Sequence, residues 1–252
     1  GTTQPVLTLS ASGSGAMEAA LVNLLSPGDE IVAVEGGKFG ERWGKIAEAY
    51  GLTVHRVKVA YGRVATPEEV ESAIAAHPAA KAVFVTHSET STGALFPVYE
   101  IAKVARAKGL LTVVDAVTSF GVYDLHFDGS LLDAVVWGSQ KGMMIPPGLG
   151  YVCYGPRAWA AAEKASLPKF YFNLTKARVS LEKGDTPFTP AISLVIAAHV
   201  AASMMAAEGR ENVFLRPNAD RTEDRSGLDA EAVTSQVQLV LSRELAREVI
   251  AK

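Results

Sequence analysis

The sequence predicts an α/β fold with a doubly wound, mostly parallel sheet. Strand-like runs alternate with helix-like runs along most of the 252 residues, which is the pattern of successive βαβ units. Several of these strand-like runs are almost entirely apolar, as residues 81–86 illustrate, and such runs are typical of strands covered on both faces. A capping box at Thr66-Pro67-Glu68-Glu69 marks a helix between two of the strands.

Composition limits the classes of function. Hydrophobic residues make up 48% of the chain, enough for one large domain or one and a fraction. The net charge of -3 gives no support to nucleic acid or to an anionic membrane as a partner. No apolar run reaches the length of about 18 residues that a membrane-spanning helix needs. Cys153 is the single cysteine, which excludes an internal disulfide framework and favours a reducing, cytoplasmic location.

The first predicted element is a short strand at residues 6–9. It leads through a Ser/Gly-rich turn at residues 10–15 into a helix that ends near Leu25. Small residues directly before a helix leave backbone N–H groups free at its positive end, which suits a phosphate group. An ordinary N-capped helix, with Ser12 or Ser14 as the cap, has the same pattern, so this stretch alone leaves both interpretations open.

Two further strands precede the next polar motif. Residues 31–34 form the first, and Gly36-Gly37-Lys38-Phe39-Gly40 leads into a helix that reaches about residue 50. Phe39 could serve as an apolar contact between its helix and the core. Residues 52–59 alternate as the second strand, and the helix that begins at Thr66 ends near His77.

Hydroxyl side chains follow the apolar strand at residues 81–86. Ser88, Thr90, Ser91 and Thr92 lie where strands of an open α/β sheet deliver ligand contacts, at their carboxyl ends. A Ser/Thr-rich loop without a ligand would have the same composition.

Two more strands end near ionisable side chains. After a helix at residues 97–108, residues 110–114 form a strand that ends in Asp115, and residues 132–137 form a strand that leads to Lys141. Apolar and proline-rich chain around a lysine is expected to desolvate it partly, which lowers its pKa and makes the amine a nucleophile toward an aldehyde. Asp115 could instead be an ordinary turn aspartate, and Lys141 could be a solvated lysine without a chemical role.

The remaining segments complete the large domain. Residues 123–129 carry acids and a histidine, but nothing nearby completes a ligand set, so we expect a surface loop and no metal site. Residues 148–154 form a strand and residues 158–165 a helix. The proline-containing segment 184–190 is expected to be extended, before an apolar helix at residues 191–205.

Four stretches in this order resemble the fold-type I pyridoxal-phosphate (PLP) enzymes. They are Ser12-Gly13-Ser14-Gly15-Ala16-Met17-Glu18, residues 86–93, residues 113–119 and Trp137-Gly138-Ser139-Gln140-Lys141-Gly142. Within that fold the chain is similar, over about residues 7–205, to the class V aminotransferases of the alanine–glyoxylate and serine–pyruvate type. The resemblance implies a three-layer large domain with a mostly parallel sheet, residues 1–212, and an incomplete small C-terminal domain, residues 213–252.

The resemblance also implies roles for single residues. Lys141 would hold PLP as a Schiff base and act as the general base. The other residues implied at the cofactor are Ser14, Gly15 and Ala16 at the phosphate, Phe39 on the ring, Thr90 near the phenolate oxygen, Asp115 at the pyridine nitrogen, Val117 beneath the ring and Gln140 beside the lysine. Thr186 and Thr189 would reach the phosphate of the other subunit of a homodimer.

The implied reaction moves an amino group from a small L-amino acid, alanine or serine, to a 2-oxo acid, glyoxylate or pyruvate. Aspartate or an aminophosphonate remains open as the amino donor. A PLP-dependent lyase or desulfurase on the same fold is an alternative. It is disfavoured because desulfurases carry histidines where this chain has Phe39 and Gln140. A catalytically inactive binding relative is the third alternative.

That third alternative rests on the end of the chain. The family carries an arginine that binds the substrate carboxylate in its small domain, a geometry that lysine does not reproduce. The arginines beyond about residue 212 lie in no matching context; they are Arg216, Arg221, Arg225 and Arg243. We therefore expect that the sequence is truncated or diverged there, or lacks internal pieces, and that it also lacks the family's longer N-terminal arm.

Overall fold

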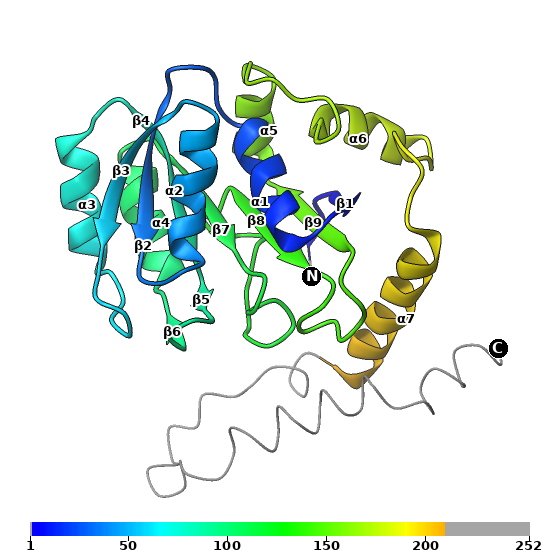
Figure 1. The fold of residues 1–252 in the computed structure, drawn as a ribbon. Coiled ribbons are helices and arrows are strands. Elements are labelled where there is room, and N and C mark those ends of the chain that lie inside the picture. Colours follow the sequence, from blue (N-terminus) through cyan, green and yellow to red (C-terminus); the bar gives the residue numbers. More distant parts are fainter. Residues whose placement is uncertain (1, 210–252) are drawn as a thin grey trace, which may run out of the picture.

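The computed structural model describes residues 2–209, in which a seven-stranded sheet lies between two layers of helices (Figure 1). Its strand order is β1-β9-β8-β7-β4-β2-β3. The strands are β1 (Val6–Ser10), β2 (Glu30–Glu35), β3 (Thr53–Lys58), β4 (Ala80–Thr86), β7 (Leu111–Asp115), β8 (Ala134–Gly138) and β9 (Leu149–Tyr154). The short strands β5 (Ser88–Glu89) and β6 (Ala94–Leu95) form a separate hairpin. The predicted α/β fold is confirmed.

Strand direction places the carboxyl ends of several strands at one edge. β2 pairs in parallel with β3 and β4, and β4, β7 and β8 continue the parallel series. β9 is antiparallel to both β8 and β1. The side chains that follow β2, β4, β7 and β8 are therefore brought to the same edge of the sheet.

Helices cover both faces because the strands alternate between two apolar clusters. Ile31 and Ala33 of β2 belong to one cluster, and Val32 and Val34 to the other. Buried residues of α1 (Gly13–Val22), α2 (Gly40–Ala49), α5 (Pro156–Ala162) and α6 (Leu174–Glu182) belong to the first cluster. Those of α3 (Pro67–Ala76) and α4 (Val98–Ala107) belong to the second.

Local signals fix the start of α3 and the end of α4 as predicted. Thr66 Oγ1 accepts a hydrogen bond from the Glu69 backbone N–H at 3.3 Å, and the Glu69 carboxylate accepts one from the Thr66 N–H at 2.9 Å, so the capping box is confirmed. Gly109, just after α4, has φ of +82°, a conformation that glycine adopts without strain.

The last described helix, α7 (Ile192–Glu208), exposes much apolar surface. None of its residues is fully buried, and Ile192, Ile196 and Met204 are exposed. No helix in the described part of the chain is both long and apolar enough to cross a membrane. The proposed small-domain remnant, residues 213–252, and the four arginines named in it lie outside the described residues.

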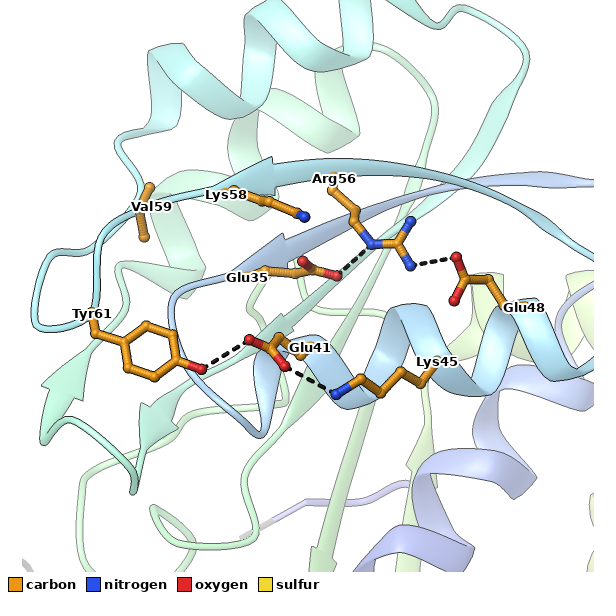
Figure 2. Close-up of a pocket in the computed structure, with 8 residues that line it drawn as sticks. All are labelled: Glu35, Glu41, Lys45, Glu48, Arg56, Lys58, Val59 and Tyr61. Carbon is orange, nitrogen blue, oxygen red and sulfur yellow. Dashed lines mark hydrogen bonds and ion pairs between the residues drawn. The ribbon is translucent and has the colours of Figure 1, made fainter.

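A charged cavity of about 330 Å³ lies at the outer edge of the sheet, between α2 and the ends of β2 and β3 (Figure 2). Arg56 bridges two carboxylates, with Nε 2.9 Å from Glu35 Oε1 and Nη2 2.6 Å from Glu48 Oε1. Lys45 Nζ lies 3.0 Å from Glu41 Oε2. The pair of Arg56 with Glu48 joins β3 to α2, and we interpret Arg56 as a tie between that helix and the sheet.

Replacing Arg56 with methionine is expected to lower the free energy of unfolding by about 2 to 3 kcal/mol at pH 8, because Glu35 is buried and would lose its ion pair. Burial raises the pKa of Glu35, so the loss should shrink as the pH falls and this carboxylate takes up a proton. Urea unfolding measures both effects. Lys45→Met, in an exposed pair that lines the same cavity, is the control and should change little; equal losses in the two variants would contradict this account.

Candidate active site

A cavity of about 180 Å³ lies at the edge where the parallel strands end. Its lining brings together residues that are far apart in the sequence: Ser12, Gly13, Ser14, Met17, Phe39, Arg42, Ser88, Thr90, Asp115, Val117, Thr118, Gln140 and Lys141. Seven of the residues implied by the sequence are among them, namely Ser14, Phe39, Thr90, Asp115, Val117, Gln140 and Lys141.

Asp115 supplies a buried carboxylate at the end of β7. Its Oδ1 accepts a hydrogen bond from the Val117 backbone N–H at 2.8 Å, and Thr86 Oγ1 lies 3.4 Å from Oδ2. Burial raises the pKa of Asp115 to about 6, against the lowering effects of the Val117 N–H and the charge of Arg42. The carboxylate is therefore mostly ionised at neutral pH and is suited to a cationic partner.

The start of α1 forms another wall. Ser12 is the N-cap and accepts a hydrogen bond from the Gly15 N–H at 3.4 Å. The first N–H groups of a helix have no carbonyl partner within it, so those of Gly13 and Ser14 have no acceptor inside α1 and are suited to bind an anion. Gly15 and Ala16 do not line the cavity, and the Ala16 N–H donates to Ser12 O. The lining is thus shifted toward the cap from the predicted Ser14 to Ala16 stretch.

Gly13 allows α1 to approach Val117, two residues after Asp115. A Cβ added to Gly13 would lie 2.8 Å from a methyl carbon of Val117. Gly13 therefore lets the start of α1 lie close to the Asp115 end of the cavity, because a larger residue at this position would force α1 or Val117 to shift.

Phe39 and the loop after β4 are joined by a fully buried carboxylate, Glu89. Its Oε2 accepts hydrogen bonds from the backbone N–H groups of Phe39 at 3.2 Å and Gly40 at 2.9 Å, at the start of α2. Its Oε1 accepts from the Ser91 hydroxyl at 2.6 Å. Glu89 thus fixes the Phe39 turn relative to the loop that carries Thr90.

Replacing Glu89 with glutamine removes one of the two acceptor oxygens. We expect a loss of about 2 kcal/mol in the free energy of unfolding, because hydrogen bonds to a buried charged acceptor are replaced by fewer and weaker ones. Urea unfolding at pH 7 measures the loss. Ser91→Ala removes a single donor to the same carboxylate and should cost less. A Glu89→Gln variant as stable as the parent chain would contradict the role of Glu89 in joining Phe39 to the loop after β4.

The predicted hydroxyl motif is ordered by its neighbours. Thr90 Oγ1 donates a hydrogen bond to Thr118 Oγ1 at 3.1 Å, and Thr118 Oγ1 donates to Ser88 O at 2.8 Å. Thr118 therefore couples the loop after β4 to the loop after β7. It was not singled out from the sequence, where it is one of several hydroxyl residues near Asp115.

Lys141 lies three residues beyond the end of β8 and lines the cavity. It is an exposed residue, so the partial desolvation expected from its apolar and proline-rich flank is not observed. The reason is local: Met144, Pro146 and Pro147 are exposed themselves and do not cover it. Beside it, Gln140 Oε1 is buried and has no hydrogen-bond partner within the described residues.

Three other predicted features lie away from the cavity. Thr186 and Thr189 are exposed in the loop before α7, where Thr186 Oγ1 donates to Phe188 O at 2.9 Å. Their proposed reach to another subunit stays a prediction. Cys153 is buried in β9, and burial raises the pKa of its thiol to about 11, so it is a poor source of thiolate.

Arg42 is the cavity residue that sequence reasoning missed most clearly. Its guanidinium donates a hydrogen bond to Ser14 Oγ at 2.9 Å and lies 4.8 Å from the centroid of the Phe39 ring. The sequence did contain a signal for Arg42. It lies three residues after Phe39, about one helical turn, and this spacing places the two side chains on the same face of the helix.

Comparison with known proteins identifies the class to which this fold and site belong. The model of the aminotransferase class-V family matches residues 2–222, and the chain belongs to that family. Its structure is similar to a subgroup IV aspartate aminotransferase from Thermus thermophilus, with a TM-score of 0.77 and 36% identity over 84% of this chain and 59% of that one. It is also similar to an alanine–glyoxylate aminotransferase from Nostoc sp., with a TM-score of 0.79 and 30% identity over 84% and 57%.

Two curated relatives carry different kinds of name. The chain is 43% identical to the soluble hydrogenase 42 kDa subunit of Anabaena cylindrica, over 91% of this chain and 61% of that protein. It is 34% identical to L-aspartate–glyoxylate aminotransferase of Paracoccus denitrificans, over 89% and 58%. The chain spans about three-fifths of the length of these relatives. Its resemblance to the class V aminotransferases is thereby confirmed.

The family implies PLP, and the residues present fit that group. Its anionic phosphate matches the free N–H groups and hydroxyls at the start of α1, and its pyridine nitrogen, when protonated, matches the buried Asp115 carboxylate. The unpartnered Gln140 Oε1 offers a further polar contact beside Lys141. Lys141 supplies the primary amine that would hold the aldehyde.

Proposed function

We propose that the chain is the cofactor-binding part of a PLP-dependent aminotransferase that transfers an amino group from a small L-amino acid to a 2-oxo acid. The observation that carries the proposal is the meeting of Lys141, Asp115 and Ser14 around one cavity, although they lie on three separate segments. By analogy with the glyoxylate aminotransferases that the chain resembles, glyoxylate is the preferred acceptor and pyruvate the second. Alanine and serine are the preferred donors, with aspartate the third.

The residues that line the cavity have separate roles in the proposed reaction. PLP, when bound, supplies an electron sink for the pair left as the Cα–H bond of the amino acid breaks. Asp115 keeps a positive charge favourable at the far end of the cavity, since its carboxylate is ionised and anchored by the Val117 N–H. The Lys141 amine lies at the cavity and is suited to take the proton from the substrate Cα and, with PLP bound, would deliver it to the C4′ carbon of the cofactor. Phe39 and Val117 provide apolar contacts for a flat ring.

The reaction itself gives the test. The 252-residue chain, supplied with PLP, glyoxylate and L-alanine, should produce pyruvate and glycine in equal amounts; L-serine should give hydroxypyruvate, and L-aspartate oxaloacetate. Mass spectrometry of products from ¹⁵N-labelled donors follows the transferred amino group directly. Formation of no labelled glycine from any of the three donors, with PLP and chain in excess, would count against this reaction.

A homodimer and a cytoplasmic location belong to the same proposal. The exposed apolar side chains of α7 favour a further protein surface against that helix, since contiguous apolar patches commonly mark interfaces. The single cysteine, which is buried, favours a reducing compartment. Sedimentation of the purified chain tests the dimer.

A second candidate role is favoured by the name of the Anabaena cylindrica relative, a subunit of a soluble hydrogenase. In that role the chain would act as a binding subunit of a larger assembly. The two roles differ in their prediction for Lys141, because a binding subunit has no need of its amine. Retention of all measurable function after Lys141→Ala would favour the subunit role.

A further inference from the structure

Resting on the proposed cofactor site, we propose that Arg42 is a positioning residue for the cofactor phosphate: it orients the Ser14 hydroxyl toward the phosphate and places a full positive charge behind it. The proposal begins with one contact. Arg42 Nη1 donates a hydrogen bond to Ser14 Oγ at 2.9 Å, across the packed helices α1 and α2.

The direction of that hydrogen bond follows from the chemistry of the two groups. A guanidinium has only donors, so the Ser14 oxygen must act as the acceptor. The hydroxyl hydrogen of Ser14 is then left to donate elsewhere, and Ser14 lines the cavity next to the free N–H groups of α1. A phosphate oxygen at this helix start is the acceptor that such a hydroxyl suits.

Charge points to the same role. Among the residues that line the cavity, Arg42 and Lys141 are the two that carry positive side chains, and Lys141 is the group assigned to the aldehyde. The partial charge of a helix start is about half a unit, less than a phosphate carries. Arg42, which is hydrogen-bonded to the Ser14 hydroxyl, adds a full positive charge near the expected position of the phosphate. Its field also acts on Asp115, whose pKa it lowers against the effect of burial.

A second contact keeps the guanidinium in place. Its central carbon lies 4.8 Å from the centroid of the Phe39 ring, within the range of a cation–π interaction. Arg42 is half-buried, and the neighbouring residues Trp43 and Gly44 are buried against the core, so its backbone is held firmly. The same side chain therefore links the phosphate end of the cavity to the aromatic residue expected at the ring.

The test separates the phosphate from the ring by comparing PLP with pyridoxal, which lacks the phosphate. In the full 252-residue chain, Arg42→Met should weaken the Kd for PLP roughly tenfold or more and leave that for pyridoxal within about twofold. Arg42→Lys should restore part of the loss, since a lysine can donate to Ser14 but lacks the planar fork. Lys45→Met, in the next turn of the same helix, is the control and should not change either Kd.

A double-mutant cycle tests whether Arg42 acts through Ser14. The losses of PLP affinity in Ser14→Ala and Arg42→Met should be non-additive, so that the double variant loses clearly less than the sum of the two single losses, because the hydroxyl is oriented only when both residues are present. Additive losses, or equal weakening of PLP and pyridoxal in Arg42→Met, would overturn the positioning role and leave Arg42 a purely structural residue.

Inorganic phosphate distinguishes failure of this inference from failure of the proposed function. Phosphate should raise the melting temperature of the cofactor-free chain and should do so far less in Arg42→Met. Phosphate binding that depends on Arg42, without any reaction between Lys141 and PLP, would refute the aminotransferase proposal alone. Reaction with PLP at parental affinity in Arg42→Met would refute the inference alone, and a chain that binds neither ligand would refute both.

Discussion

Replacing Lys141 with alanine is expected to abolish covalent retention of PLP after borohydride reduction and to lower the transamination rate by about 10⁴-fold or more. The reason is that one amine serves as both the anchor and the proton carrier, so its loss removes two contributions at once. Mass spectrometry of the reduced, unfolded chain measures the retained cofactor, and a coupled assay measures the rate.

Lys169 provides the matched control for that experiment. It is half-buried, burial lowers its pKa, and its amine donates hydrogen bonds to Ala165 O and Leu167 O away from the cavity. A lowered pKa makes an amine more reactive, so Lys169 is the described lysine that could compete for an aldehyde. Lys169→Ala should leave the cofactor attached. Attachment that survives Lys141→Ala and disappears in Lys169→Ala would overturn the assignment of Lys141.

Replacing Asp115 with asparagine is expected to stabilise the cofactor-free chain while removing most of its activity. The pKa of Asp115, about 6 in the folded chain against an ordinary value of 3.8, means that ionising it costs about 3 kcal/mol more in the fold than in the unfolded chain. Asparagine avoids this cost and can still accept from the Val117 N–H. Loss of the charge should lower the rate about a hundredfold or more.

The sign of the pH dependence follows from the raised pKa. Between pH 4 and pH 6 the unfolded chain has released the Asp115 proton and the folded chain has kept it, so the contribution of Asp115 to the stability of the parent chain falls as the pH rises through this window. The two proteins should therefore unfold alike near pH 3 and differ most above about pH 7. Urea unfolding at several pH values measures the difference.

Asp133→Asn is the contrasting control for that series. Asp133 is also buried, and burial raises its pKa as well, but Arg106 and Arg157 pair with its carboxylate at 3.0 and 3.1 Å, whereas no described residue forms an ion pair with Asp115. Its replacement should destabilise the chain at neutral pH, because two guanidinium groups lose their anion. An Asp115→Asn variant that is likewise less stable than the parent at pH 8 would contradict the view that the Asp115 charge is held at a cost.

Most of the fold could be predicted because its signals are local. Apolar strand runs, the capping box at Thr66 and the polar residues just after each strand are all visible in the sequence. Parallel pairing then brings those strand ends to one edge without any further information. Asp115 and Lys141 reach the same cavity for that reason.

The remaining features of the site could not be predicted because they depend on contacts between segments that are far apart in the sequence. No local sequence pattern shows that such segments meet. The Arg42 to Ser14 hydrogen bond exists because α1 packs beside α2, and the buried Glu89 carboxylate joins residues about 50 positions apart. The exposure of Lys141 was mispredicted for a related reason. Apolar neighbours in sequence cover a side chain only if the backbone turns them toward it, and Met144 is itself exposed.

The absorption spectrum of the purified chain, recorded with added PLP and again after L-alanine or L-serine, tests the cofactor site most directly. The account predicts a visible band that borohydride bleaches and that an amino acid shifts to shorter wavelength, because the amino acid replaces the Lys141 amine on the cofactor. A spectrum that is only the sum of free PLP and protein, unchanged by either reagent, would contradict the account.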